Sequence, residues 1–403
     1  MRLFKTALPT GLLAVAILST SVAYATDQEL LDTLFQNGVL NKAQYAKLTQ
    51  KATEKEAEAA AKVENLSPDT TTAMDWASRV KITGDMRFRH ENVDKDDANG
   101  VKDSRQRIRA RLKIAAKVND QVDVGLRLVT RGSQTSGNRN LEGSFVSKDL
   151  FFDRAYINWR PDFVKGLTAT FGKFKQPWYN ASSHGLIWDS DVNPEGVALR
   201  YKRQVGPLKL TATGGYFILE DGDTVKGSAN NDGFSDDLNM YHAGISAAMQ
   251  MTKDIKGTLG SNVYIYNNES AVGNFNDANA LEIYEVASRI DFNTAFLPVY
   301  VYGQYATNAS AEDGKDTAWL AGFGAKLGAF KMDYNYRDTQ QFAVADTFND
   351  STFAKGNTAA RGHKVKLTYA ISRNFATGMA YYAAEEYNGT NTDTLQLDLK
   401  AKF

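Results

Sequence analysis

The chain lacks cysteine altogether and carries no net charge. Its 403 residues contain 47 Lys and Arg against 47 Asp and Glu. The absence of cysteine excludes disulfide bonds, thiolate metal sites and a cysteine nucleophile. Net neutrality argues against a nucleic-acid-binding protein, because such proteins carry an excess of basic side chains. We therefore expect no nucleic acid among the partners of this chain.

Long hydrophobic runs are also scarce. The mean hydropathy is −0.41. This value argues against a helical membrane protein, but not against a membrane β-barrel, in which lipid-facing and lumen-facing residues alternate. Proline occurs only 7 times, against 31 glycines, 21 phenylalanines and 19 tyrosines. Such a composition is typical of strands and turns.

The most apolar run is short and lies near the N-terminus, from Gly11 to Leu18. Arg2 and Lys5 precede it, and Ala23-Tyr24-Ala25 offers a cleavage site of small residues. Residues 1–25 are therefore predicted to be a cleavable secretory signal peptide. The alternative, an anchoring helix, is disfavoured because the run is too short to span about 30 Å of hydrocarbon.

Residues 26–66 have a helical pattern. The leucines at 30, 31 and 34 predict a short helix that ends at Gly38, and Asn41 can cap a second one. Residues 42–63 are rich in Ala, Lys, Glu and Gln, which are good helix formers. Their apolar stripe is narrow, so we expect either a periplasmic coiled coil between protomers or a solvated extension. Residues 67–78 are predicted to be a linker.

From Val80 to the C-terminus the hydrophobic period changes to two. In one segment Ile108, Leu112 and Ile114 alternate with basic residues, as in a strand with one apolar face. We place about 16 such strands by this alternation. They begin near residues 79, 105, 121, 149, 166, 195, 207, 240, 256, 280, 297, 317, 329, 361, 373 and 393.

The connections between these strands alternate in length. Residues 118–121 and 204–207 are short, whereas residues 132–148, 176–194 and 338–360 are long. Short periplasmic turns and long extracellular loops indicate a transmembrane barrel. A soluble β-sandwich or propeller would also alternate, but would not need lipid-facing aromatics. The last strand ends in Phe403 and resembles the assembly signal of outer-membrane barrel proteins. We predict an all-β fold, a 16-stranded antiparallel barrel over residues 79–403.

The cost of placing charge in lipid decides which face of each strand points inward. Each Arg or Lys facing the midplane of the bilayer costs about 2–4 kcal/mol. The basic residues of the second strand must therefore face the lumen. The same parity gives the candidate pore-lining and selectivity residues: Arg87, Arg89, Arg107, Arg109, Arg111, Lys113, Arg127, Arg154 and Arg200.

The neutral net charge conceals an uneven distribution. Residues 79–203 carry a net +9, residues 204–403 a net −7 and residues 1–78 a net −2. One wall of the lumen is therefore predicted to be basic, which favours anions. The long segment 176–194 could fold inward and place Asp189, Asp191 and Glu195 opposite this wall, where they would set up a transverse field. Alternatively, it is an external loop.

Two segments resemble the Gram-negative "putative porin" family, which is related to the phosphate-selective porins. They are Leu167–Trp178 and Leu186–Tyr201; Asp153–Tyr156 and Leu30–Leu48 also fit. The resemblance implies a 16-stranded diffusion channel of the outer membrane that assembles as a homotrimer. Phosphate-selective members carry a lysine-rich cluster, whereas the loop 267–280 has no lysine, so a dedicated phosphate channel is not expected.

We therefore expect a porin that passes small anions or polar solutes and contacts outer-membrane lipid. The histidines at 90, 184, 242 and 363 are widely separated and show no metal-ligand spacing. We expect no enzyme, no metal and no cofactor. The alternative is a structural anchor, in which the N-terminal helix tethers the barrel to peptidoglycan or to a periplasmic partner.

Overall fold

The computed structural model describes residues 31–64, 76–96, 100, 102–220, 238–267, 281–294, 296–311 and 314–403. The chain divides into two compact units, residues 1–81 and residues 82–403. Each unit is described by itself below. The predicted signal peptide, and most of the predicted linker, lie outside the described residues.

The first unit is helical. Residues 31–36 form one helical segment, α2 (Lys42–Glu64) forms another, and residues 76–78 form a helical turn. Asn41 and Gln44 cap α2 reciprocally, because each backbone N–H donates to the other's side chain, at 3.0 and 2.9 Å. The ring of Phe35 stacks on Tyr45 with centroids 4.5 Å apart. In the part of the chain that the structure describes, none of the helices combines the length and apolarity needed to cross a membrane.

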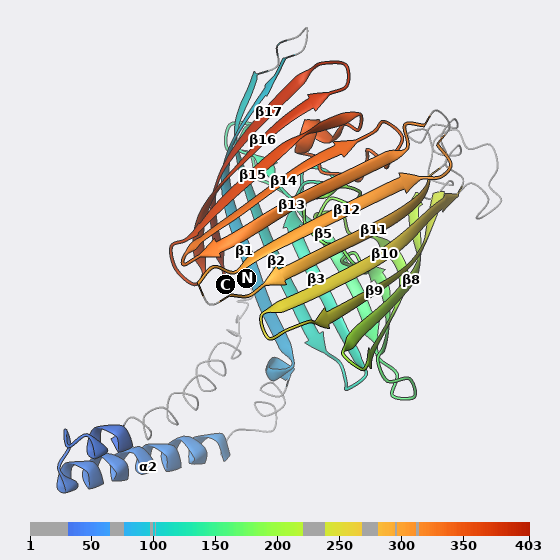
Figure 1. Ribbon diagram of the computed structural model, residues 1–403. Coiled ribbons are helices and arrows are strands. Elements are labelled where there is room, and N and C mark those ends of the chain that lie inside the picture. Colours follow the sequence, from blue (N-terminus) through green and yellow to red (C-terminus); the bar gives the residue numbers. More distant parts are fainter. Residues whose placement is uncertain are drawn as a thin grey trace, which may run out of the picture. The chain divides into compact units, whose positions relative to one another are not determined.

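The second unit is a closed antiparallel barrel of 16 long strands (Figure 1). A two-residue strand, β4, joins its sheet. The strands are β1 (Val80–Lys95), β2 (Lys102–Lys117), β3 (Val122–Thr130), β4 (Arg139–Asn140), β5 (Leu150–Trp159), β6 (Leu167–Lys173), β7 (Glu195–Val205), β8 (Leu208–Glu220), β9 (Leu238–Gln250), β10 (Ile255–Asn267), β11 (Glu282–Phe292), β12 (Val299–Asn308), β13 (Thr317–Leu327), β14 (Phe330–Thr339), β15 (Ala360–Ala370), β16 (Phe375–Glu386) and β17 (Asn391–Lys402). The predicted fold class is confirmed.

The barrel closes where its last strand meets its first. β17 pairs with β1 from the Asp85–Lys402 pair to the Lys95–Thr392 pair. Phe403 and Gly84 then exchange both backbone hydrogen bonds, at 2.9 and 3.0 Å. Each long strand of the described barrel thus has a neighbour on both sides, as a sheet in hydrocarbon requires.

Apolar and polar residues separate across the barrel wall as the alternation predicts. On β1, Met86 and Phe88 are 59% and 44% exposed on the outer face, whereas Arg89 and Glu91 are buried. Exposed apolar side chains continue along the outside of the other strands, for example Leu199 on β7 and Leu397 on β17. This apolar outer face suits contact with lipid.

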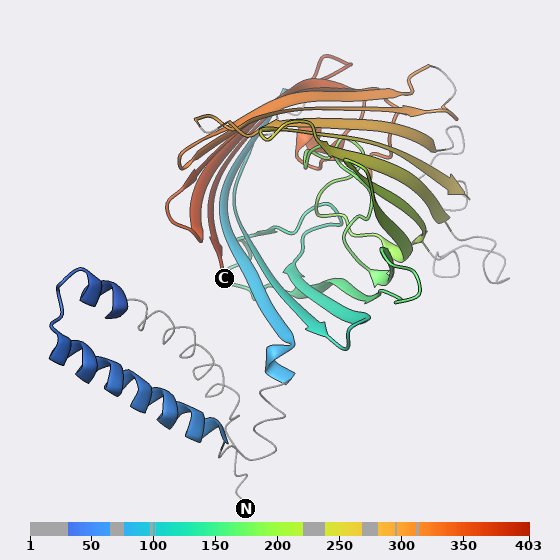
Figure 2. The same cartoon turned by 60° about the horizontal axis from the view of Figure 1, so that its bottom comes forward.

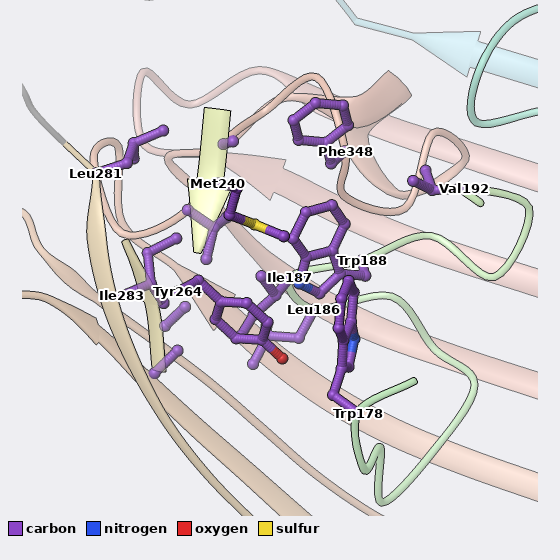
Figure 3. Close-up of a cluster of buried hydrophobic side chains, with 14 of the residues drawn as sticks. Trp178, Leu186, Ile187, Trp188, Val192, Met240, Tyr264, Leu281, Ile283 and Phe348 are labelled. Carbon is purple, nitrogen blue, oxygen red and sulfur yellow. The ribbon is translucent and has the colours of Figure 1, made fainter. Parts of the chain in front are cut away.

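The buried apolar core lies inside the barrel. Two connecting segments, residues 174–194 and 340–359, contribute to it, and Figure 2 shows the first of them (green) within the ring of strands. Their apolar side chains pack on inward-facing residues of the strands β8 to β13, among them Phe217, Met240 and Tyr264. In Figure 3, Trp188 lies between Trp178 and Phe348. One side of the lumen is therefore filled.

Candidate functional site

The rest of the lumen contains a polar cavity of about 450 Å³. One wall is formed by β1 and β2, through Arg87, Arg89, Arg107 and Arg109. The strands β15 to β17 form the neighbouring wall, and the two inward segments lie opposite with the stretch Asp189–Asp191 and with Asp350. Charged side chains of the barrel wall and of the two inward segments therefore surround this cavity.

Segment 174–194 is held in the lumen by hydrogen bonds as well as by its apolar core. The Gln176 side-chain amide donates to the carbonyls of Asp189 and Val192, at 2.7 and 3.0 Å. From the wall, the amide of Asn262 donates to the Tyr179 carbonyl at 3.1 Å. The lumenal placement of residues 176–194, one of the two alternatives from the sequence, is therefore the one observed.

The two inward segments contact each other directly. The backbone N–H of Asp189 donates to the Phe348 carbonyl at 2.6 Å, and that of Asp350 donates to the Gly185 carbonyl at 3.0 Å. Gly185 has a φ of +69°, and a Cβ there would lie 3.2 Å from the Cβ of Asp350. The positive φ and this close approach favour glycine at position 185. The segments thus form one unit that borders the cavity.

Asp189 and Asp350 lie close together but have opposite electrostatic surroundings. Lys364 and Arg337 approach the Asp350 carboxylate at 3.1 and 3.4 Å. Burial would raise the pKa of Asp350, but these two cations outweigh it and lower the pKa to about 2. Asp189 has no such cation; burial and then the charges of Asp350 and Asp191 raise its pKa to about 8.

Asp191 reaches across to the basic wall. Its carboxylate lies 3.9 Å from Arg109 and 3.7 Å from Arg111, and accepts a hydrogen bond from the N–H of Gly137 at 3.2 Å. Burial would raise its pKa, but the arginines and this N–H outweigh burial and lower it. We call Arg107, Arg109 and Arg111 of β2 and Arg127 of β3 the arginine ladder. The acidic segment therefore contacts this ladder instead of facing it across a gap.

Acidic partners accompany most of the predicted arginine ladder. Arg107 pairs with Glu91 at 3.0 Å. Arg109 and Arg111 share Asp85 at 3.1 and 2.8 Å. Arg127 pairs with Asp153. Carboxylates inside the lumen thus balance most of the positive charge of the ladder. The alternation of inward-facing and outward-facing residues along a strand does not reveal this pairing.

The remaining predicted residues are spread over the lumen. Arg87 donates to the Asn138 side chain at 2.5 Å, and Arg154 donates to Asn193 at 2.7 Å. Arg200 borders a separate cavity of about 180 Å³ beside Trp178 and Tyr179. Lys113 lies cross-strand from Arg127. Arg89 forms two hydrogen bonds to Asp398, at 2.6 and 2.9 Å.

Glu195 does not lie where the sequence analysis expects it. It begins β7 with the same parity as Val197 and Leu199, whose side chains are exposed on the outer face. Its own side chain is 58% exposed and contacts Lys173 of β6. The segment ends at Pro194, and the strand parity that follows turns Glu195 outward, away from Asp189 and Asp191.

The sequence analysis missed several charged residues of the cavity. They are Glu91, Arg105, Asp350, Lys364, Lys366, Asp398 and Lys400. The parity rule could have found those on β15 and β17, because Lys364 and Lys366 alternate with Val365 and Leu367. The net negative charge of residues 204–403 conceals these lysines, although closure of the barrel brings β17 beside β1.

Comparison with known proteins was made on sequence and on structure. A family model described as "putative porin" matches residues 99–292 and 277–403. No curated protein matches the chain. A solved structure of Pseudomonas putida OprB is similar, with a TM-score of 0.55 and 10% identity over 82% of this chain and 96% of that one. A mutant of the Rhodopseudomonas blastica porin aligns with a TM-score of 0.49 and 13% identity, over 80% of this chain and 100% of that one.

Proposed function

The chain belongs to the "putative porin" family, and from this premise we propose that it is a passive diffusion channel of the outer membrane for small hydrophilic solutes, with a mild preference for anions. The observation that carries the proposal is the polar cavity inside the barrel. Its lining includes the basic residues of β1, β2, β15 and β17. Cationic side chains that line a narrow passage attract anions.

The balance of charge in the cavity supports a mild preference instead of a strict one. The lining contains Arg87, Arg89, Arg105, Arg107, Arg109, Lys355, Lys364, Lys366 and Lys400. The acidic lining residues are Glu91, Asp103, Asp189, Asp191, Asp350 and Asp398. Basic residues are in excess, but most of them lie beside a carboxylate.

A homotrimer and export by a cleaved signal peptide belong to the same proposal.

Reversal potentials in a salt gradient across planar bilayers test the proposal. Replacement of Arg107, Arg109 and Arg111 by Ser leaves Glu91, Asp85 and Asp191 without these partners, so the reversal potential should shift towards cations. The matched control replaces Lys165, Lys253 and Arg373, which are exposed in the short turns, and should behave as the unchanged protein. Lack of stable conductance from refolded protein contradicts a channel, and an unshifted reversal potential contradicts the assigned selectivity role.

A second candidate function rests on α2. This helix is 23 residues long and belongs to a unit distinct from the barrel, as a tether to peptidoglycan or to a periplasmic partner would require. Deletion of residues 27–66 separates the two functions. A porin keeps its conductance after this deletion. A tether loses its association with the cell wall, measured by co-sedimentation with purified peptidoglycan.

A further inference from the structure

Strands from both ends of the barrel domain bring several cations together on one side of the cavity. We call Arg87 and Arg89 of β1, Lys366 of β15 and Lys400 of β17 the cationic cluster; all four line the cavity. Arg87 lies cross-strand from Lys400, and Arg89 from Asp398. The like charges of Lys400 and Lys364 act on Lys366, and those of Arg89 and Arg109 act on Arg87. The opposite charges that act on the two residues are those of Asp398 on both, Asp333 on Lys366 and Asp191 on Arg87.

Few carboxylates balance this cluster. Asp398 is engaged by Arg89 at 2.6 Å and by Lys400 at 2.9 Å. Asp333 lies cross-strand from Lys366, but its oxygens accept hydrogen bonds from Tyr300 at 2.5 Å and Tyr302 at 2.9 Å, and His184 lies 2.8 Å away. Among the described residues, the structure records no ion pair for Arg87 or Lys366.

The hydrogen-bonding capacity of Arg87 is also incompletely used. Its Nη2 donates to Asn138, whereas its buried Nε has no partner among the described residues. A buried donor without an acceptor is costly, and unbalanced like charges add to that cost in a partly desolvated cavity. An anion in the cavity would relieve both costs.

The wall between the lysines leaves room for such an anion. Lys366 lies cross-strand from Ala380 of β16, and the neighbouring lumen-facing position on that strand is Gly378; both residues line the cavity. Ala380 is small and Gly378 has no side chain, so these two positions put no bulky group into the space between Lys366 and Lys400. This space continues into a cavity of about 450 Å³, which is large enough for a small organic molecule.

The opposite side of the cavity supplies hydroxyl groups. Ser190 comes from one inward segment, and Ser351 and Thr352 come from the other; all three line the cavity. Hydroxyls both donate and accept hydrogen bonds, so they suit the hydroxyl groups of a solute. A molecule with a carboxylate at one end and hydroxyls along its length would meet a complementary partner at each end.

We propose that the cationic cluster binds the carboxylate of a small hydroxylated organic acid as that solute crosses the lumen, while the serine and threonine hydroxyls opposite bind its hydroxyl groups. The inference rests on the proposed channel function and deepens it by assigning a solute class. It places the binding residues on Arg87, Lys366 and Lys400, not on the arginine ladder, whose charges are paired.

Block of the chloride current by D-gluconate in planar bilayers tests the proposal with the full-length protein. Gluconate should reduce the current in a saturable manner, while glucose, which lacks the carboxylate, should not. Acetate lacks the hydroxyls and should block more weakly. Lys366→Gln should raise the half-blocking gluconate concentration about tenfold, because it removes one charge-assisted contact. Lys366→Arg should restore the block, and Lys326→Gln, an exposed residue near a short turn, should leave it unchanged.

The outcomes separate this inference from the proposed function. Loss of all conductance contradicts the channel itself. Stable, anion-preferring conductance without gluconate block overturns only the binding site. An unchanged half-blocking concentration in Lys366→Gln overturns the assignment to the cationic cluster. Equal block by inorganic phosphate and gluconate overturns the solute class in favour of a general oxyanion site.

Discussion

Trp188 stacks on Phe348, with ring centroids 5.2 Å apart and an interplanar angle of 22°. The two residues belong to different inward segments, one between β6 and β7 and the other between β14 and β15. Trp188 also packs on Trp178 at 4.8 Å and on Tyr264 of the wall at 5.7 Å. The indole therefore joins both segments to the barrel, on the side of the lumen opposite the basic wall.

Replacement of Trp188 by Ala should loosen the cavity border. Trp188 is 5% exposed, and removal of a buried tryptophan side chain costs about 3–5 kcal/mol. The substitution removes packing between the two inward segments, and it leaves the hydrogen bonds between the strands intact. We expect a larger and noisier single-channel conductance in planar bilayers, with unchanged strand content by circular dichroism.

A lipid-facing tryptophan provides the control. Trp319 on β13 is 41% exposed on the outer face, so Trp319→Ala should leave the conductance unaltered. If Trp188→Ala conducts as the unchanged protein does, the inward segments do not border the conducting path.

The selectivity should depend on pH through Asp189. Its pKa of about 8 means that the carboxyl group is mostly protonated at pH 6 and ionised at pH 9.5. Asp350 and Asp191, which face it, have lowered pKa values and stay ionised over this range. A negative charge therefore appears at the cavity border as the pH rises. The anion preference, measured as the reversal potential in a salt gradient, should fall with a midpoint near pH 8.

Asp189→Asn isolates this effect. The amide keeps the shape of the side chain but cannot ionise, so the reversal potential of this variant should change less between pH 6 and 9.5 than that of the unchanged protein. A variant that retains the same midpoint would assign the titration to another group, and a flat profile in the unchanged protein would contradict the raised pKa.

Much of the barrel was predictable because lipid imposes a strict rule on each strand. The expected strand starts lie within about three residues of those observed, since alternation, turn residues and the cost of charge in hydrocarbon act locally. Arg89 and Arg107, which the alternation assigns to the lumen, line the cavity. These features depend on residues near one another along the chain.

The apolar filling of the lumen was not predictable in the same way. Phe217 and Ile283 face inward, while their neighbours Ile218 and Tyr284 face outward, so these strands are apolar on both faces at one end. This loss of alternation was a signal, but it does not identify what covers the inner face. The pairing of Arg109 with Asp85 and Asp191 likewise depends on contacts between separate elements, which periodicity does not encode.

The Arg89–Asp398 pair should contribute strongly to the stability of the barrel seam. Its side chains are only 9% and 7% exposed, and the guanidinium binds the carboxylate through two hydrogen bonds. Asp398→Asn removes the nearer of the two carboxylates that Arg89 contacts and leaves only Glu91, at 3.5 Å. Loss of one partner of a buried ion pair costs about 3–5 kcal/mol. Urea unfolding of the refolded protein in detergent micelles should show that the free energy of unfolding falls by this amount.

The Arg361–Glu385 pair is a matched control, because it also joins neighbouring strands, β15 and β16, but is 49% and 47% exposed. Glu385→Gln should cost at most about 1 kcal/mol. The double variant Arg89→Met with Asp398→Leu should recover part of the loss, since it removes both charges of the buried pair, while Lys400 still loses its contact with Asp398. Equal losses in Asp398→Asn and Glu385→Gln would mean that water screens both pairs alike, and that the seam is held by backbone pairing alone.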